Sequence, residues 1–169
     1  MQTTSSKIDT LKLLNYVNGQ WIEGDGDGTP LFNSVTGAQI ATATTKGLDF
    51  ASILDYGRKT GGSTLRKMTF QERGQMLKAL AMYLHGMKDK YYPISYQSGA
   101  TRVDSWIDIE GGIGNLFAYA SLRKQFPNEP YYVDGEAAAL SKGGSFIGHH
   151  IMVPKEGIAV HINAFNFPI

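Results

Sequence analysis

The alternation of apolar and polar residues predicts short strands first and helices afterwards. Two apolar-aromatic runs flank Asn18-Gly19, and this pair is typical of a β-hairpin turn because both central residues need a positive φ. A second strand–turn–strand unit is predicted around Thr36-Gly37. Residues 1–13 lack both patterns, and we expect them to form a loose polar leader or a frayed first turn.

Helical periodicity is predicted from about residue 48 to 59, with a break at Gly61-Gly62. The next helix has a sharp beginning, since Thr69 and Glu72 have the spacing of a capping box. In that motif each side chain accepts a hydrogen bond from a backbone donor that the first turn leaves free. The apolar face predicted for this helix consists of Leu77, Leu80, Leu84 and Met87.

A longer helix is predicted from about residue 103 to 123, after Pro93 interrupts the previous helix and Gly99 caps it. It contains three glycines in the sequence EGGIGN, each costing about 1 kcal/mol relative to alanine. Close packing against another helix would explain them, and so would space cleared for a ligand. The predicted apolar face of this helix consists of Val103, Trp106, Ile113, Phe117 and Ala120.

The last forty residues predict β structure. Two extended segments are expected near 131–133 and 145–153, separated by GEAAALSKGG. The run from Gly157 to Ile162 is apolar on both faces apart from His161, which fits a central parallel strand covered on both sides. Parallel strands need partners joined by long crossovers, so we expect the chain to continue beyond Ile169.

No metal site is predicted from the acidic residues or the histidines. The sequence DGDGTP lacks the glutamate that completes a calcium loop, since Thr36 occupies that position. His149 and His150 are adjacent on a predicted strand and therefore point to opposite faces. His85 lies off the apolar face of its helix, and His161 is expected to be a hydrogen-bonded core residue.

Composition narrows the class of protein. Of 169 residues, 42% are apolar and 18% are charged, values typical of a soluble globular protein. The net charge is +1 and no basic cluster stands out, so neither nucleic acid nor an anionic membrane is an expected partner. The polar N-terminus lacks a signal-peptide core, which predicts a cytoplasmic protein. Cysteine is absent, which excludes a cysteine nucleophile within these residues.

Several sequence stretches resemble the aldehyde dehydrogenase superfamily. YVNGQW, FNSVTGAQIATAT, TFQERGQMLKALAMYL and SYQSGATR occur in the family's order and spacing, before a strand that ends in NFP. SGATRVDSWIDIEGGIGNLFAYASL and GIAVHINAFNFP are similar to the dehydrogenase half of the bifunctional phenylacetate-degradation family (PaaZ or PaaN). The resemblance covers residues 14–169 and implies an α/β chain. That chain would be the N-terminal fragment of the aldehyde dehydrogenase fold, with β-hairpins, helices and the first strand of a Rossmann-like parallel sheet.

The resemblance implies three regions. Residues 1–129 would be the N-terminal part of the cofactor-binding domain, and residues 130–153 would be a hairpin that forms a homo-oligomer. Residues 154–169 would be the first Rossmann-like strand and the NFP motif, truncated. The implied reaction is oxidation of a CoA-linked semialdehyde to the acid with NADP, or NAD, as cofactor. A fused hydratase domain can follow in this family.

The resemblance also implies roles for single residues. Asn166 would donate a hydrogen bond to the oxyanion that forms when a thiolate attacks the aldehyde. Phe167 would face the substrate tunnel, and Gly112, with its glycine neighbours, would widen that tunnel for a CoA-linked acyl chain. The family usually has Pro-Trp before the asparagine, where this chain has Ala-Phe. The residues implied to line the nicotinamide side of the cofactor pocket are Ile162, Asn163, Ala164 and Phe165.

Other interpretations stay open from the sequence. The family's cysteine nucleophile, glutamate base and glycine-rich turn do not occur in these residues, so the chain alone is expected to be inactive. It could instead be a non-catalytic module that pairs with a partner through its hairpin, or a small-molecule-binding fragment. A fragment of a benzoyl-CoA-pathway semialdehyde dehydrogenase is a further alternative. Asn166 could also be a turn-forming residue ahead of Phe-Pro.

Overall fold

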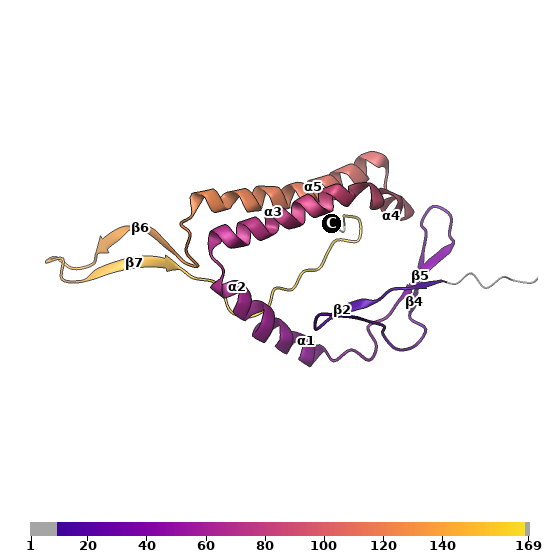
Figure 1. Ribbon diagram of the computed structural model, residues 1–169, viewed down its shortest axis with the longest axis horizontal. Coiled ribbons are helices and arrows are strands. Elements are labelled where there is room, and N and C mark those ends of the chain that lie inside the picture. The colour runs from indigo at the N-terminus through magenta and orange to yellow at the C-terminus, as the bar shows by residue number, and fades with distance from the viewer. Residues whose placement is uncertain (1–9, 168–169) are drawn as a thin grey trace, which may run out of the picture.

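The computed structural model describes residues 10–167 and combines helices with small sheets. Figure 1 shows two long helices, α3 and α5, side by side, with the N-terminal strands toward one end and a β-hairpin projecting from the other. This mixture confirms the predicted α/β class. The central helices are α3 (Phe70–Met87) and α5 (Arg102–Ser121).

The first predicted hairpin is confirmed. Strands β2 (Asn15–Val17) and β3 (Gln20–Ile22) pair antiparallel across the expected turn. Asn18 has φ 51° and Gly19 has φ 83°, as this turn requires. The local sequence was sufficient here because asparagine and glycine tolerate the left-handed conformation that the turn demands.

The second strand pair is also confirmed, and it has an additional strand beside it. Strands β4 (Thr29–Phe32) and β5 (Gln39–Ala43) are antiparallel, and β1 (Leu11–Lys12) pairs parallel to β5 on its other edge. The expectation of a loose leader is therefore wrong at Leu11–Lys12, while residues 1–9 lie outside the described residues. Two residues are too short for any periodicity to show.

The predicted helix break at Gly61-Gly62 is wrong. Helix α1 (Phe50–Tyr56) continues through a wider π-helical segment, η1 (Gly57–Gly62), into α2 (Ser63–Lys67). Gly62 has right-handed helical angles, φ −62° and ψ −43°. The hydroxyl of Thr64 donates to the carbonyl of Thr60 at 2.8 Å, which helps to satisfy the backbone of the wider turn.

The start of α3 is confirmed, and its predicted apolar face is confirmed in part. Glu72 N donates to Thr69 Oγ1 at 3.2 Å, and Thr69 N donates to Glu72 Oε2 at 2.9 Å, which completes the capping box. Gly74 and Ala81 are the buried residues of the helix, and the predicted Leu84 packs against the core, whereas Leu80 is 46% exposed. Small residues one heptad apart let α5 approach closely, and this contact decides which face is covered.

Gly74 is the glycine on which close helix packing depends. A Cβ atom added there would lie 2.7 Å from Arg123 Cβ and 3.0 Å from the carbonyl oxygen of Ala120. We expect Gly74→Ala to lower the free energy of unfolding by about 1–3 kcal/mol, measured by urea denaturation, because neighbouring atoms must shift. Gly86→Ala in the same helix is the matched control, since an added Cβ there meets no atom within 4 Å. That change should stabilise by about 0.5–1 kcal/mol, and equal effects at both sites would contradict the prediction.

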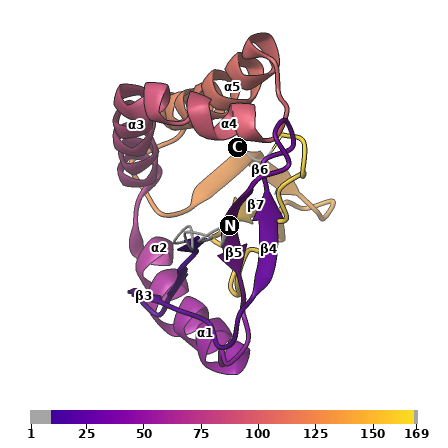
Figure 2. The same cartoon turned by 90° about the vertical axis from the view of Figure 1, so that its right-hand side faces the viewer.

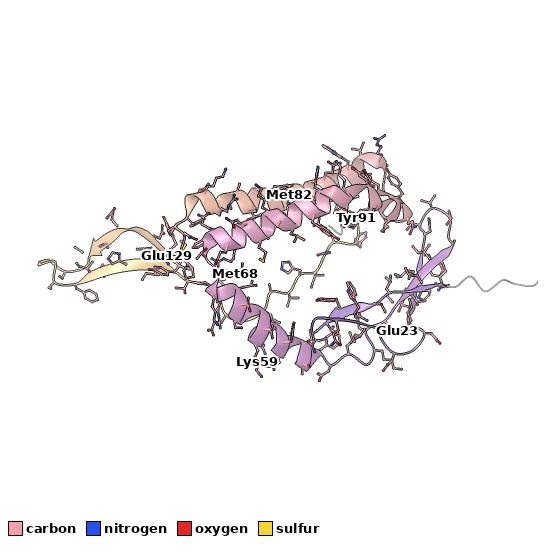
Figure 3. All side chains as sticks on the ribbon, in the orientation of Figure 1. Glu23, Lys59, Met68, Met82, Tyr91 and Glu129 are labelled. Carbon is pink, nitrogen blue, oxygen red and sulfur yellow. The ribbon has the colours of Figure 1, made fainter. Side chains whose placement is uncertain are left out.

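Helix α5 covers the predicted span, and its predicted face is confirmed in the second half, where Ile113 and Ala120 are buried and Phe117 packs against the core. Its Ile109 is fully buried and packs with Ala81 and Ile113 in the core. Val103 and Trp106, predicted as core, are 63% and 55% exposed. At the start of α5 the buried residue is instead Ser105. Its burial is tolerated because its hydroxyl accepts a hydrogen bond from the hydroxyl of Ser95 at 2.9 Å. Figure 3 shows Tyr91 at the same end of the helical pair.

A short helix, α4 (Tyr92–Gln97), connects α3 to α5 after the 3₁₀ turn η2 (Lys88–Lys90). Pro93 lies in the first turn of α4, where proline is well tolerated, so it begins a new helix after the interruption. The predicted cap at Gly99 is confirmed, since Gly99 has φ 88° and donates to the carbonyl of Tyr96 at 3.1 Å.

The β-hairpin predicted at 130–153 is present, although its first strand is longer than expected. Strands β6 (Tyr132–Ala139) and β7 (Ile147–Met152) are antiparallel. Aromatic stacking fixes the base of the hairpin after η3 (Leu122–Gln125): Phe126 stacks on Phe70 at 4.5 Å and contacts Tyr132 edge-on at 5.3 Å. Phe70 N also donates to the carbonyl of Glu129, which Figure 3 labels at this junction.

The strand predicted over residues 157–162 is absent from the described structure. This segment runs back along the molecule without pairing with any strand within residues 10–167 (Figure 1). Val160 is 76% exposed, and His161, predicted as a core residue, is exposed. A strand exists only where a neighbour supplies its hydrogen bonds, and the described residues contain no such neighbour.

Candidate functional site

A hollow of about 330 Å³ lies between the last described residues and the turn from α4 to α5. Figure 2 shows the C-terminal segment reaching this place beneath α4. The hollow therefore joins two parts of the chain that are far apart in sequence. Its lining residues are Ser98, Gly99, Ala100, Asp104, Phe165, Asn166 and Phe167.

One wall of the hollow is a short and well-bonded connection. The Ser98 hydroxyl donates to the carbonyl of Ser95 at 2.7 Å, and Gly99 adopts the left-handed conformation that ends α4. Thr101 then caps α5, because its hydroxyl accepts a hydrogen bond from Asp104 N at 3.2 Å. Two capped helix ends in succession hold the backbone of this wall in one position.

Asp104 contributes a carboxylate to the lining. This carboxylate accepts hydrogen bonds from the Thr101 hydroxyl at 2.6 Å and from Thr101 N at 3.3 Å. It also lies in the first turn of α5, where the helix dipole favours negative charge. A second anion in the hollow would be repelled by this carboxylate. Asn166 lines the same hollow, and the NH2 group of its side-chain amide can donate hydrogen bonds.

The structure brings only part of the predicted site together. Asn166 and Phe167 line the hollow, and Phe165 joins them. Gly112 lies eight residues beyond Asp104 on α5, about 12 Å along the helix axis. The proline of the NFP motif and Ile169 lie outside the described residues.

The predicted cofactor residues form an open stretch of chain. The side chain of Ile162 is 91% exposed and that of Phe165 is 96% exposed. Two apolar side chains displayed in this way fit one wall of a pocket for a flat, weakly polar ring. Asn163 and Ala164 lie between them and are also exposed.

Two of the three glycines of α5 have the space that the ligand hypothesis requires. A Cβ atom added at Gly111 or Gly114 would meet no atom within 4 Å among the described residues. Close helix packing is therefore the wrong explanation for these two positions. Gly112 between them is half-buried.

Sequence patterns did not indicate the wall made by Ser98, Ala100 and Asp104. They indicated Gly99 as a cap, and SYQSGATR gave only a family signal. The available signal was the succession of two caps, which forces a sharp and rigid turn of the chain. Which distant segment faces that turn is not encoded in local periodicity.

A second polar cluster lies around Glu110. Its carboxylate accepts hydrogen bonds from Lys88 Nζ and from the Tyr92 hydroxyl, both at 2.9 Å. The bond from Lys88, followed by that from Tyr92, lowers the pKa of Glu110. The pKa of Tyr92 is raised, first by desolvation and then by donation to the carboxylate. Glu110 is therefore ionised at neutral pH, and the contribution of this cluster to stability is lost as acid protonates it.

Two features are absent from the part of the chain that the structure describes. Within residues 10–167, no helix has the length and hydrophobicity needed to cross a bilayer. In the same part of the chain, no three metal-binding side chains gather in one place.

Comparison with known proteins identifies the family. The chain is 40% identical to a 3,4-dehydroadipyl-CoA semialdehyde dehydrogenase of Aromatoleum evansii over 159 residues. The match covers 94% of this chain and 31% of the relative, so the chain spans about a third of the relative's length. No family model matches the chain. The relative is an aldehyde dehydrogenase and matches nearly the whole chain, so the chain belongs to the aldehyde dehydrogenase superfamily, as its motifs predicted.

Proposed function

We propose that the chain is the N-terminal portion of an NAD(P)-dependent dehydrogenase that oxidises a CoA-linked semialdehyde to the acid. The observation that carries the proposal is the position of Asn166 and Phe167 in the hollow beside the capped α4–α5 turn. The relative supports the substrate class, since its name specifies a CoA-linked semialdehyde. A cytoplasmic location belongs to the same proposal.

In the proposed reaction Asn166 stabilises the tetrahedral oxyanion. Its side-chain N–H donates to the aldehyde oxygen as a thiolate attacks the carbonyl carbon. A single donor of this kind lowers the activation barrier by about 3–4 kcal/mol. The 169 residues contain no cysteine, so the thiolate must come from polypeptide outside them. Phe167 covers the substrate side of the hollow.

A nicotinamide cofactor, when bound, supplies the hydride acceptor that this oxidation needs. The exposed side chains of Ile162 and Phe165 would form one wall against its ring and exclude water from that face. Asn163 and Ala164 would approach it through the extended backbone between them. We propose NADP as the cofactor, with NAD as the alternative.

The test of the proposal is an assay of the full gene product. We expect it to reduce the nicotinamide cofactor when a CoA-linked semialdehyde is added, followed by absorbance. The 169-residue chain alone should show no turnover, because it has no thiol. Turnover by the chain alone, or failure of a thiol-containing full product to oxidise any CoA-linked semialdehyde, would overturn the proposal.

Two CoA-linked semialdehydes from different catabolic pathways are candidate substrates. The sequence resemblance favours a semialdehyde of aerobic phenylacetate catabolism, and a benzoyl-CoA-pathway semialdehyde is the alternative. The kcat/KM for the two semialdehydes, measured side by side on the full gene product, distinguishes them. The phenylacetate assignment requires the larger value for its own semialdehyde.

Gly112 provides a prediction about substrate size. We propose that the glycines of α5 clear space for the acyl chain, and the open positions of Gly111 and Gly114 support this. Gly112→Leu in the full enzyme should raise KM about tenfold for a CoA-linked semialdehyde and much less for a short free aldehyde. The reason is that the leucine side chain would occupy the space proposed for the long acyl chain. Gly86→Leu, at an open position on α3, is the control and should change neither KM. Equal effects of Gly112→Leu on both substrates would refute the tunnel role.

The hairpin supports a second, compatible role in assembly. Its apolar side chains are displayed to solvent, with Ile147 58% exposed and Ile151 56% exposed. Each of the two strands also has an unpaired edge among the described residues. We expect the protein to form dimers or larger homo-oligomers, and Ile151→Asp to shift them toward monomer in light scattering. A monomer at micromolar concentration before any substitution would contradict this prediction.

A further inference from the structure

A groove of about 620 Å³ lies between α4 and α5, and no part of the proposed reaction uses it. It is separate from the hollow that holds Asn166. The first turn of α5 divides the two, since Arg102 and Val103 line the groove and Asp104 lines the hollow. A ligand extending around this turn would contact both sites.

The groove is formed by side chains at helical spacing. Arg102, Trp106 and Glu110 are four residues apart on α5 and follow one face for about 12 Å. Tyr92 and Tyr96 are spaced in the same way on α4, with ring centroids 6.1 Å apart. A groove of this length with aromatic sides has dimensions suited to a nucleoside.

The aromatic rings of the groove are available to a ligand. Trp106 is 55% exposed and Tyr96 is 40% exposed. Both side chains line the groove, so a ligand in it would contact aromatic surface. A planar base is a suitable cover, because stacking on an aromatic side chain contributes about 1–3 kcal/mol.

The charges are arranged unevenly along the groove. At one end Lys88 and Tyr92 neutralise the carboxylate of Glu110 through hydrogen bonds of 2.9 Å. Asp89 lines this same end beside Lys88. At the other end the side chain of Arg102 makes no ion pair or hydrogen bond with any residue from 10 to 167. An anionic group would therefore be held at the Arg102 end and repelled by Asp89 at the other.

We propose that this groove binds the adenosine phosphate end of coenzyme A, with adenine on Trp106 and Tyr96 and the ribose phosphate on Arg102. Guanidinium and phosphate form bidentate, charge-assisted hydrogen bonds. The flexible pantetheine arm then passes the first turn of α5 to deliver the aldehyde to Asn166. This inference rests on the proposed function, because the CoA-linked substrate class comes from there.

Tryptophan fluorescence provides the test. The chain contains two tryptophans, so Trp21→Phe leaves Trp106 as the single indole. Titration with free coenzyme A should quench its fluorescence to saturation. Arg102→Gln should weaken binding about tenfold, the equivalent of one charge-assisted bond. Arg58→Gln removes the same charge from an exposed position outside the groove and should leave binding unchanged. Calorimetry on the unsubstituted chain gives the same answer if Trp21→Phe impairs folding.

Related ligands show which part of coenzyme A is recognised. Pantetheine, which has no nucleotide, should not quench, and dephospho-coenzyme A should bind more weakly than coenzyme A. NADP also contains an adenosine phosphate and is therefore the alternative ligand for the groove. Equal affinity for NADP would overturn the assignment to coenzyme A, and binding insensitive to Arg102→Gln would overturn the phosphate contact. Absence of saturable binding would overturn the whole inference. The dehydrogenase proposal is tested separately, because these titrations contain no aldehyde and measure no turnover.

Discussion

Asn166→Ala in the full-length enzyme should lower kcat by about 10²–10³-fold, because the oxyanion loses a hydrogen-bond donor that acts only in the transition state. KM should change little, since the ground-state carbonyl depends less on this donor. Steady-state kinetics with a CoA-linked semialdehyde measure both constants. Asn166→Asp should be at least as severe, because it replaces the donor by a carboxylate of similar shape and adds a charge near Asp104.

Asn128→Ala is the matched control for this experiment. Asn128 is an exposed asparagine after η3 and does not line the hollow. Its kinetics should equal those of the unsubstituted enzyme. If Asn166→Ala changed KM alone, or changed nothing, Asn166 would be a turn-forming residue and the oxyanion role would be wrong.

Ile109→Ala should lower the free energy of unfolding by about 2–5 kcal/mol, the largest stability effect expected from a single core truncation in this chain. Ile109 has no exposed surface and packs where α3 meets α5, with Ala81 and Ile113 around it. Removing its outer carbons creates a cavity that the two long helices cannot close without moving apart. Urea denaturation followed by circular dichroism measures the change.

The same helix offers the control for this truncation. Ile107→Ala removes the same atoms from a side chain that is 49% exposed. It should cost less than about 1 kcal/mol, because little apolar surface is returned to water. Equal losses for both variants would mean that α5 does not pack on α3 through Ile109.

Local signals predicted turns and helix starts well. The hairpin at Asn18-Gly19 and the capping box at Thr69 are confirmed because the residues that form each feature are near neighbours in sequence. A capped helix end at Gly99 was predicted for the same reason. In each case one or two side chains satisfy a backbone requirement that has few other solutions.

Helix faces and long-range pairings were predicted less well. Trp106 follows the apolar spacing of α5, yet the structure leaves it in a groove, while Ser105 beside it is buried. Hydrophobic periodicity shows that a helix has an apolar side, but neighbours decide which residues they cover. The pairing of Leu11–Lys12 with β5 was missed because no local pattern marks a two-residue strand.

The sequence by itself determined the family, the mixed helix and strand content, and the asparagine of the NFP motif as the residue to examine. These follow from motif order and from interactions between residues a few positions apart. Only the tertiary structure showed that Asn166 lies against the turn at Gly99 and that Arg102 lines a groove with an exposed tryptophan. It also showed that Gly74 is closely packed, whereas Gly111 and Gly114 are open. Each of these facts depends on contacts between distant segments, whose geometry the folded chain decides as a whole.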